Sequence, residues 1–297
     1  MMYAEIVDKV EGKIVPKECV RRLKSNICSL YISKGRIREA ESYKDHVIGV
    51  TQEFDKLLPQ FKHRLIRTSE RIQEVLKIRL SSKDVIKAIA LPVILHDHGK
   101  VYKAYQEGRS PSYRHEVVSS AIIYRLLKEK LKLNFIIAAH LSLAVLLHHQ
   151  PRTYKLLEDF NQYLITQSML LEILKGLKDE DFKLSNIERE ELADVIKSSL
   201  TITSGFNKTL IDELVNYIVT YFPKVNDIVR DIIIIQSIHV GLPNAEIRRL
   251  LRFFTAMVNH MIIICDNITA YRNRAKEPEC VKSCGSTLGA IFSLIYG

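Results

Sequence analysis

The chain is poor in the residues that make tight turns. It has 11 Gly and 8 Pro among 297 residues, about half of the share that soluble proteins usually carry. An all-β sandwich or barrel needs a turn every few residues, so this scarcity argues against both architectures. Trp is absent, while Tyr is 13 and Phe is 10. Any stacking on nucleobases would therefore fall to Tyr and Phe.

Sorting and membrane signals are also missing. The N-terminal MMYAEIVDKVEGK has no apolar segment followed by a small-residue cleavage site, so no signal peptide is expected. The longest apolar run, Leu133 to Leu147, contains Asn134, His140 and Ser142. It spans about 15 residues, which is short for a membrane span and suits a buried helix. We therefore expect a cytoplasmic protein without a membrane segment.

Two kinds of ligand-binding motif are absent. The chain has no G-x-x-x-x-G-K-[ST] sequence, so it has no Walker A loop to hold nucleotide phosphates. Its 5 Cys form no C-x-x-C pair, and reduced thiols are expected. Cys280 and Cys284 could meet on one helical turn, but a zinc site would need two more ligands of that kind.

What the chain does have is enough apolar sequence for a core and an excess of positive charge. Hydrophobic residues make up 47%, and 44 Lys and Arg against 34 Asp and Glu give a net charge of +10. This balance favours an anionic partner without naming it. Two stripes are candidate contacts for such a partner, with plain solvated helix faces as the alternative: Lys62, Arg64, Arg67 and Arg71, and Arg248, Arg249 and Arg252.

Hydrophobic periodicity predicts helices along most of the chain. Residues 1–20 are less regular and are expected to form a short hairpin or an arm, and the tail 276–297 stays unassigned. We interpret 1–297 as a single helical domain in which 152–240 is an insertion or accessory layer. The predicted helices cover 40–58, 62–80, 83–97, 112–131, 134–149, several segments of 155–240 broken near 183–186, 204–207 and 222–225, and about 244–274.

The sharpest local feature is LHDHGK, Leu95 to Lys100. His96 and Asp97 follow Val93 by three and four residues, so both point to the buried side of the preceding helix. A buried ionised Asp is costly without a cation or donors, and a helix C-terminus disfavours negative charge. A metal ion would relieve both problems.

Two further elements repeat this arrangement. His148-His149 stands at the end of an apolar helix, three and four residues past Val145. Adjacent buried imidazoles repel when protonated, so they should stay neutral, which is the form that binds metals. Asp266 lies in the apolar run MIIICDNI. It is either a further ligand or the partner of Arg272 or Arg274.

The order His46 … His96-Asp97-x-Gly99-Lys100 … His115 … His148-His149 … Asp266 resembles the HD superfamily of metal-dependent phosphohydrolases. Within it, the chain is similar to the CRISPR-associated HD nucleases of type I systems in their stand-alone form. The likeness rests on YKDHVIGVTQEFDKLL, HDHGKVYKAYQ, YRHEVVSSAI, AVLLHHQP and CDNITAYR, mainly in 40–155 and the final helix. It implies an all-α fold, an HD-domain helical bundle.

The resemblance also implies a site for two divalent ions. One ion would be held by His46, His96, Asp97 and Asp266. Asp97 would bridge to a second ion, held by His115, His148 and His149. Two such ions can clamp a phosphodiester and activate a water molecule as the nucleophile. Imidazole ligands favour Mn, Co, Ni or Zn, whereas Mg, the alternative, prefers oxygen.

Other residues near the motifs have two interpretations each. Lys100 would stabilise developing phosphate charge beside the catalytic Asp97, or be a solvated helix-end residue. Arg114 would contact a nucleic-acid phosphate, or form a surface salt bridge. His98 replaces a commonly apolar residue and should lie behind the ligands or at the surface. His63 competes with His46 as the first ligand. Three other histidines are expected to be packing residues: His140, His239 and His260.

The function that the resemblance implies is a metal-dependent nuclease, an endonuclease or exonuclease on single-stranded DNA, with RNA as an alternative. It would act in CRISPR interference, an antiviral defence, with a separate helicase subunit and an RNA-guided effector complex. The rival enzyme is an HD phosphohydrolase acting on small nucleotides, which needs only one ion. The non-catalytic rival is a basic helical subunit with a structural or degenerate metal site.

Overall fold

A computed structural model describes residues 27–33, 36–106, 114–149, 165–242 and 244–275. The hairpin or arm expected in 1–20, the tail and the Cys280/Cys284 pair lie outside these residues. The described part is predominantly helical, as predicted, and contains one antiparallel hairpin of two strands, β1 (Cys28–Ser33) and β2 (Arg36–Ser42). The sequence analysis assigned no structure to this hairpin, which leads directly into the first long helix.

That helix, α3 (Tyr43–Leu76), corrects the prediction of two helices over 40–58 and 62–80. It runs through Pro59, which lacks a backbone N–H and usually breaks a helix. Pro59 lies on the exposed side, where water can satisfy the carbonyl that loses its partner. The helix ends at Leu76 because Lys77 adopts a left-handed conformation with φ of 54°.

Three helices that carry or adjoin the motif residues follow α3 along the chain. Ser81 caps the next helix, its hydroxyl accepting from the Asp84 N–H at 3.1 Å. The predicted helices over 83–97, 112–131 and 134–149 are confirmed within a few residues. The elements here are α4 (Ser82–Leu95), the 3-10 turn η1 (His98–Val101), α5 (Lys103–Gln106), α6 (His115–Glu129) and α7 (Phe135–Leu146).

The remaining helices break where the sequence predicts. Ser185 and Asn207 cap two of them through their side chains, accepting from the N–H groups of Glu188 and Leu210. The elements are α8 (Gln167–Ile173), the 3-10 turn η3 (Asp179–Phe182), α9 (Asn186–Ile202), α10 (Lys208–Thr220), α11 (Val225–Val240) and α12 (Ala245–Ala275).

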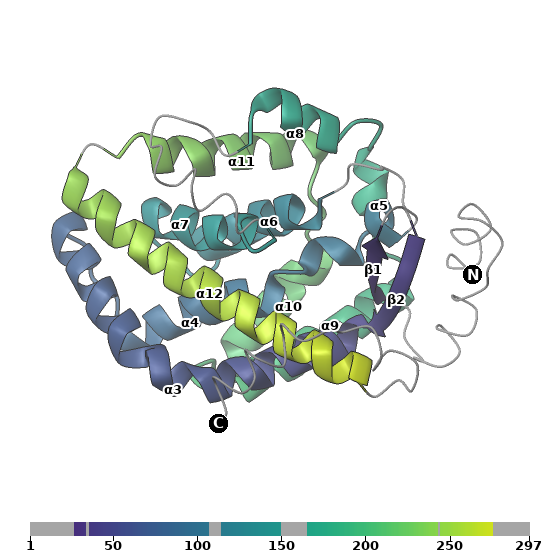
Figure 1. Ribbon diagram of the computed structural model, residues 1–297, viewed down its shortest axis with the longest axis horizontal. Helices are drawn as coiled ribbons and strands as arrows, with labels where there is room; N and C mark the ends of the chain where they lie inside the picture. The colour runs from purple at the N-terminus through teal and green to yellow at the C-terminus, as the bar shows by residue number, and fades with distance from the viewer. Residues whose placement is uncertain (1–26, 34–35, 107–113, 150–164, 243, 276–297) are drawn as a thin grey trace.

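The helices pack around one core, and α12 crosses the front of the molecule obliquely (Figure 1). α12 lies against α3 and α7, α6 pairs with α7, and α11 covers both. α9 packs on α3 and on α10. One continuous cluster of buried apolar side chains extends from Ile27 to Cys265. The segment Ala245–Asn273 is long and apolar enough to cross a membrane, but 61% of its most apolar window is buried inside the protein, as in a core helix.

Candidate metal centre

His96 and Asp97 lie at the end of α4, and each is only 1% exposed. The Nδ1 atom of His96 lies 2.8 Å from the carbonyl oxygen of Val93. A carbonyl can only accept, so Nδ1 must carry the proton and Nε2 keeps its lone pair. That Nε2 lies 3.6 Å from Asp97 Oδ2 and 3.9 Å from Oδ1 of Asp266. The ring is therefore held in the tautomer of a metal ligand.

The structure brings His46 from α3 and Asp266 from α12 to the same point. His46 Nε2 lies 3.2 Å from Asp97 Oδ2 and 3.5 Å from Asp266 Oδ1. One ligand atom from each of His46, His96, Asp97 and Asp266 lies within 4.8 Å of the others. We call this set the first group. Arg272, the alternative partner of Asp266, instead pairs with Glu53.

A residue that the sequence analysis missed stands behind His46. Glu41, on β2, places Oε1 2.9 Å from His46 Nδ1, and Asn273 donates to Glu41 Oε2 at 2.8 Å. Burial lowers the pKa of His46, but the charges of Glu41 and Asp97 outweigh it and raise that pKa to about 10. The only signal for Glu41 was its place shortly before His46, and without a predicted hairpin that spacing carried no meaning.

The second group is built by Asp97, His115, His148 and His149, whose ligand atoms also lie within 4.8 Å of one another. His115 Nε2 lies 3.0 Å from both Asp97 Oδ1 and His149 Nε2, and His148 Nε2 lies 3.7 Å from Asp97 Oδ1. His148 Nδ1 faces the Val145 carbonyl at 2.6 Å, which fixes the same tautomer as in His96.

The two groups share Asp97, whose oxygens are divided between them. Oδ2 faces the first group and Oδ1 the second. Burial raises the pKa of Asp97, but Lys100, His96 and His115 outweigh it and hold that pKa well below its ordinary value. The buried Nε2 atoms of His96 and His148 make no hydrogen bond within the described residues. Cations between these atoms and the carboxylates would satisfy them, so the donor set fits metal ions.

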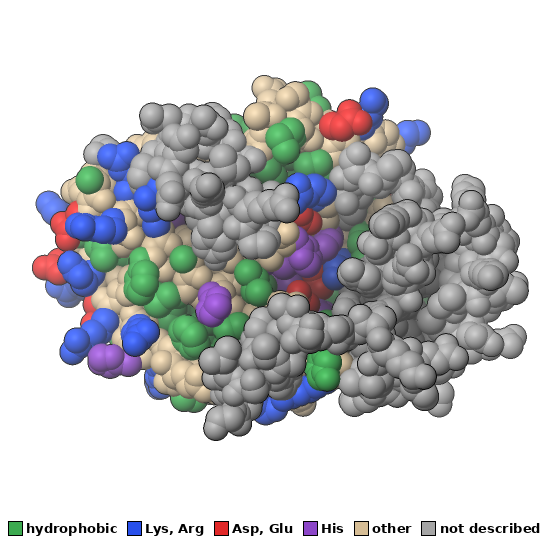
Figure 2. Space-filling model, in the orientation of Figure 1, with side chains coloured by type: hydrophobic (Ala, Val, Ile, Leu, Met, Phe, Trp, Pro, Cys, Tyr) green, Lys and Arg blue, Asp and Glu red, His purple; other side chains and the backbone are tan. Residues whose placement is uncertain are grey.

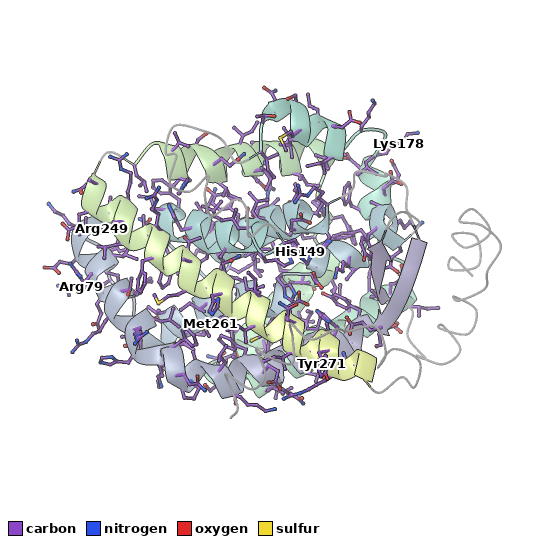
Figure 3. The ribbon with its side chains drawn as sticks, viewed as in Figure 1. Arg79, His149, Lys178, Arg249, Met261 and Tyr271 are labelled. Carbon is purple, nitrogen blue, oxygen red and sulfur yellow. The ribbon has the colours of Figure 1, made fainter. Side chains whose placement is uncertain are left out.

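The two groups open to solvent at one place. Figure 2 shows His side chains beside acidic ones in a hollow of the surface, and Figure 3 places His149 between α12 and the α6–α7 pair. His149 is exposed, whereas Asp97 is buried. Asp266 of the first group is also partly exposed, with 19% of its side chain accessible, so each group has a member that solvent can reach.

Lys100 and Arg114 are both held by carboxylates. Lys100 Nζ lies 2.6 Å from Asp97 Oδ2 and its side chain is 10% exposed, so it is not a solvated helix-end residue. Arg114 donates to Glu116 Oε1 from Nε at 2.7 Å. Glu116, missed in the sequence analysis, also lies 3.7 Å from His115 Nδ1. Burial raises its pKa, but His115 and Arg114 outweigh it and lower the pKa to about 2.

The other His belong to neither group. His63 is exposed on α3. His98 is fully buried, not at the surface, with Nε2 3.2 Å from the Tyr102 hydroxyl, and burial lowers its pKa to about 4. His140 and His239 pack together as expected, with Nε2 and Nδ1 3.4 Å apart. His260 is exposed, so the prediction of a packing role is wrong there.

Two glycines allow the ligand-bearing elements to approach closely. The N–H of Gly99 donates to Ser119 Oγ at 2.7 Å, and a Cβ on Gly99 would come within 2.8 Å of the His115 Cα. A Cβ on Gly49 would lie 2.5 Å from Thr269 Cγ2. Real Cβ atoms essentially never come this near, so only Gly fits without displacement. Both contacts lie directly beside metal-ligand candidates.

The chain is similar in sequence to three curated proteins. No family model matches it. Three curated relatives bear the name CRISPR-associated endonuclease Cas3-HD. That of Methanocaldococcus jannaschii is 27% identical over 257 residues, 82% of this chain and 94% of the relative. Those of Pyrococcus furiosus and Thermoproteus tenax are 23% and 25% identical, over 73% and 76% of this chain and 85% and 84% of the relatives.

A solved structure is also similar. It is that of the CRISPR-associated Cas3 HD domain protein from Methanocaldococcus jannaschii, with a TM-score of 0.42 and 22% sequence identity. The match covers 75% of this chain and 95% of that one.

Proposed function

We propose, on the premise that this chain is a homologue of the CRISPR-associated Cas3-HD endonucleases, that it is a metal-dependent nuclease of DNA. Single-stranded DNA is the preferred substrate, with RNA the alternative. The protein acts in CRISPR interference, an antiviral defence in the cytoplasm, with a separate helicase subunit and an RNA-guided effector complex. The observation that carries the proposal is the division of the Asp97 oxygens between two imidazole-rich groups.

The two groups would hold two divalent ions. His46, His96, Asp97 and Asp266 would hold one, and His115, His148, His149 and Asp97 the other. When bound, such ions polarise a phosphodiester and lower the pKa of a water molecule enough to make it the nucleophile. Five imidazoles and two carboxylates favour Mn, Co, Ni or Zn over Mg.

The chain's own residues then have separate tasks. Asp97 belongs to both groups, and its two oxygens fix the position of one group relative to the other. Lys100 neutralises part of the Asp97 charge at 2.6 Å and adds positive charge where a phosphate would sit. Arg114 is the candidate phosphate contact at the rim, because its side chain is one quarter exposed and is already fixed by Glu116.

The test compares wild type with Asp97→Asn on single-stranded DNA, with Mn²⁺, Co²⁺, Ni²⁺, Zn²⁺ or Mg²⁺ added to chelator-treated protein. We expect the variant to lose at least about 100-fold in rate, because the amide replaces one of the two shared oxygens by an NH2 group that cannot bind a cation and leaves the other oxygen uncharged. Asp84→Asn, on the exposed start of the same helix, is the matched control and should cleave like wild type. Cleavage by the Asp97 variant at the wild-type rate would disprove the assignment.

The same variants separate the nuclease from an HD phosphohydrolase of small nucleotides. A one-ion enzyme would turn over free nucleotides and would be little affected by His149→Ala, which changes only the second group. We expect the opposite result, in which free nucleotides persist and His149→Ala impairs DNA cleavage. Binding of DNA with no hydrolysis at any of these ions would instead indicate the non-catalytic subunit.

A further inference from the structure

The antiparallel pair α3–α12 has an exposed face that carries aromatic rings. Phe253 is 52% exposed and Tyr271 is 39% exposed, and His260 between them is exposed as well. These positions are 7 and 11 residues apart, close to whole numbers of helical turns, so the three rings share one face of α12. Arg249, one turn before Phe253, begins the same face (Figure 3). What distinguishes these rings from singly exposed apolar side chains, which are common, is that they line up along one face beside a row of cations.

Arginines of α3 lie alongside this face. Arg64, Arg67 and Arg71 are exposed and are spaced by three and four residues, so they form one row. Two contacts fix the position of the row against α12. The Phe61 ring centroid lies 6.5 Å from that of His260. A guanidinium nitrogen of Arg71 lies 3.6 Å from Glu246 Oε1.

Figure 2 shows how these side chains are distributed. Lys and Arg, interspersed with Asp and Glu, gather at the end of the molecule where α3 ends and α12 begins, and apolar side chains continue from there over α12. At the other end the same two helices supply His46 and Asp266, 3.5 Å apart. One helix pair thus carries cations at one end and metal-ligand candidates at the other, with Phe253 and His260 between them and Tyr271 just beyond Asp266.

We infer that this α3–α12 face binds single-stranded nucleic acid and leads the strand to the site. Arg64, Arg67 and Arg71 would contact phosphates, and the rings of Phe253 and Tyr271 would stack on bases. Positive grooves with aromatic platforms are how proteins bind single strands. The inference rests on the proposed function. Arg249 and Asp266 are separated by about 25 Å along α12, a distance that a short single strand can span.

The geometry favours a single strand over a duplex. Exposed rings stack only on bases whose faces are accessible, and in a duplex those faces are covered by neighbouring bases. The row of arginines alone would suit either form, because phosphate contacts carry no sequence or pairing information. The rings are therefore the discriminating feature.

The test is equilibrium binding of fluorescent oligothymidine and oligouridine, followed by anisotropy with EDTA present, so that cleavage does not interfere. Phe253→Ala is expected to weaken binding about five-fold or more, since stacking on one ring contributes that much affinity. The triple variant Arg64→Gln, Arg67→Gln, Arg71→Gln should weaken binding and flatten its salt dependence. Phe135→Ala, which removes an equally exposed phenylalanine from α7, is the matched control and should bind like wild type.

Three results would overturn the inference. The first is that Phe253→Ala and the arginine triple variant both bind the oligonucleotides within two-fold of the wild-type affinity. The second is that Phe135→Ala loses as much affinity as Phe253→Ala. The third is that wild type binds a duplex of the same length more tightly than the single strand. Hydrolysis of bis(4-nitrophenyl) phosphate, too small to reach the face from the site, should be unchanged in Phe253→Ala. If wild type cannot hydrolyse this ester with any divalent ion, the proposed function fails. The anisotropy measurement would still show whether the α3–α12 face binds single strands.

Discussion

At the scale of single residues, the groups that contact Nδ1 of the ligand-candidate imidazoles orient those rings toward the site. His96 and His148 are oriented by backbone carbonyls of their own helices, Val93 and Val145. His46 is oriented by a carboxylate from another element, Glu41. A backbone partner cannot be removed by substitution, but Glu41 can. This difference makes His46 the ligand candidate whose support can be tested directly.

We predict that Glu41→Ala weakens the first ion and spares the second. Partners that orient a ligating imidazole typically contribute 10–100-fold in metal affinity, and Glu41 contacts His46 alone among the ligand candidates. Calorimetric titration with Mn²⁺ or Co²⁺ should show one of two sites weakened about 10-fold or more. Glu70→Gln, which changes an exposed acid on α3, the helix that carries His46, should leave both sites unchanged. Equal weakening of both sites would contradict the assignment.

The ligand candidates could be predicted from the sequence, and the residues around them could not. His96, Asp97, His148 and Asp266 stand out because polar groups in apolar helical runs are rare without a purpose. Glu41 and Glu116 stand in polar surroundings where acids are common. Only the folded chain shows that a hairpin brings Glu41 to His46 and that Glu116 fixes Arg114.

At the scale of elements, the close approach of α3 and α12 determines how near the members of the first group lie to one another. Gly49 and Thr269 touch where the helices cross, and each lies one turn from a ligand candidate, His46 or Asp266. The separation of the two helices at this point therefore determines the distance between the imidazole and the carboxylate, 3.5 Å here.

We predict that Gly49→Ala pushes the helices apart and that Thr269→Ser restores them. The added methyl would meet Thr269 Cγ2 at 2.5 Å, and such overpacking typically costs about 1–3 kcal/mol of stability. Ser keeps the hydroxyl and lacks that methyl. Urea unfolding and metal titration should both show a loss in Gly49→Ala and recovery in the double variant. A double variant as impaired as the single one would exclude the contact as the cause.

The elements themselves were largely predictable, with two instructive exceptions. Helix starts at Ser81, Ser185 and Asn207 follow from capping chemistry that is local in sequence. The continuity of α3 through Pro59 depends on which side of the helix faces water, and that is decided by packing. The β1–β2 hairpin likewise depends on its position beside α3 and α12 more than on any strong local pattern.

At the scale of the whole molecule, a pair of buried imidazoles outside the candidate metal centre lies where α11 packs on α7. His140 of α7 and His239 of α11 are buried together. Burial and the His239 charge lower the pKa of His140 to about 3, and burial and Arg252 lower that of His239 to about 4. Both groups are therefore neutral in the folded protein near neutral pH.

We predict that this pair makes the protein less stable in acid. Above pH 6.5 both imidazoles are neutral, folded or unfolded, and contribute no pH dependence. As the pH falls from 6.5 toward 4, the unfolded chain binds protons that the folded one excludes, so each group lowers the free energy of unfolding by about 1.4 kcal/mol per pH unit. In urea unfolding between pH 6 and 4.5, His239→Gln should lessen this slope by that amount.

The control for this prediction is His63→Gln, which removes an exposed imidazole from α3 and should leave the slope unchanged. An unaltered slope in His239→Gln would show that the buried pair is not the origin of any acid sensitivity. The comparison uses the difference between two variants, so titration elsewhere in the molecule cancels.

The position of α12 at the end of the described chain has a consequence during protein synthesis. The second group is complete once residues 97–149 have been made, whereas the first waits for Asp266 on α12. A nascent chain emerges from the ribosome N-terminus first, so the second group of ligand candidates is synthesised long before the first is complete. An enzyme that needs both ions would stay inert while translation continues beside messenger RNA, and would gain its cutting activity only when the last helix docks.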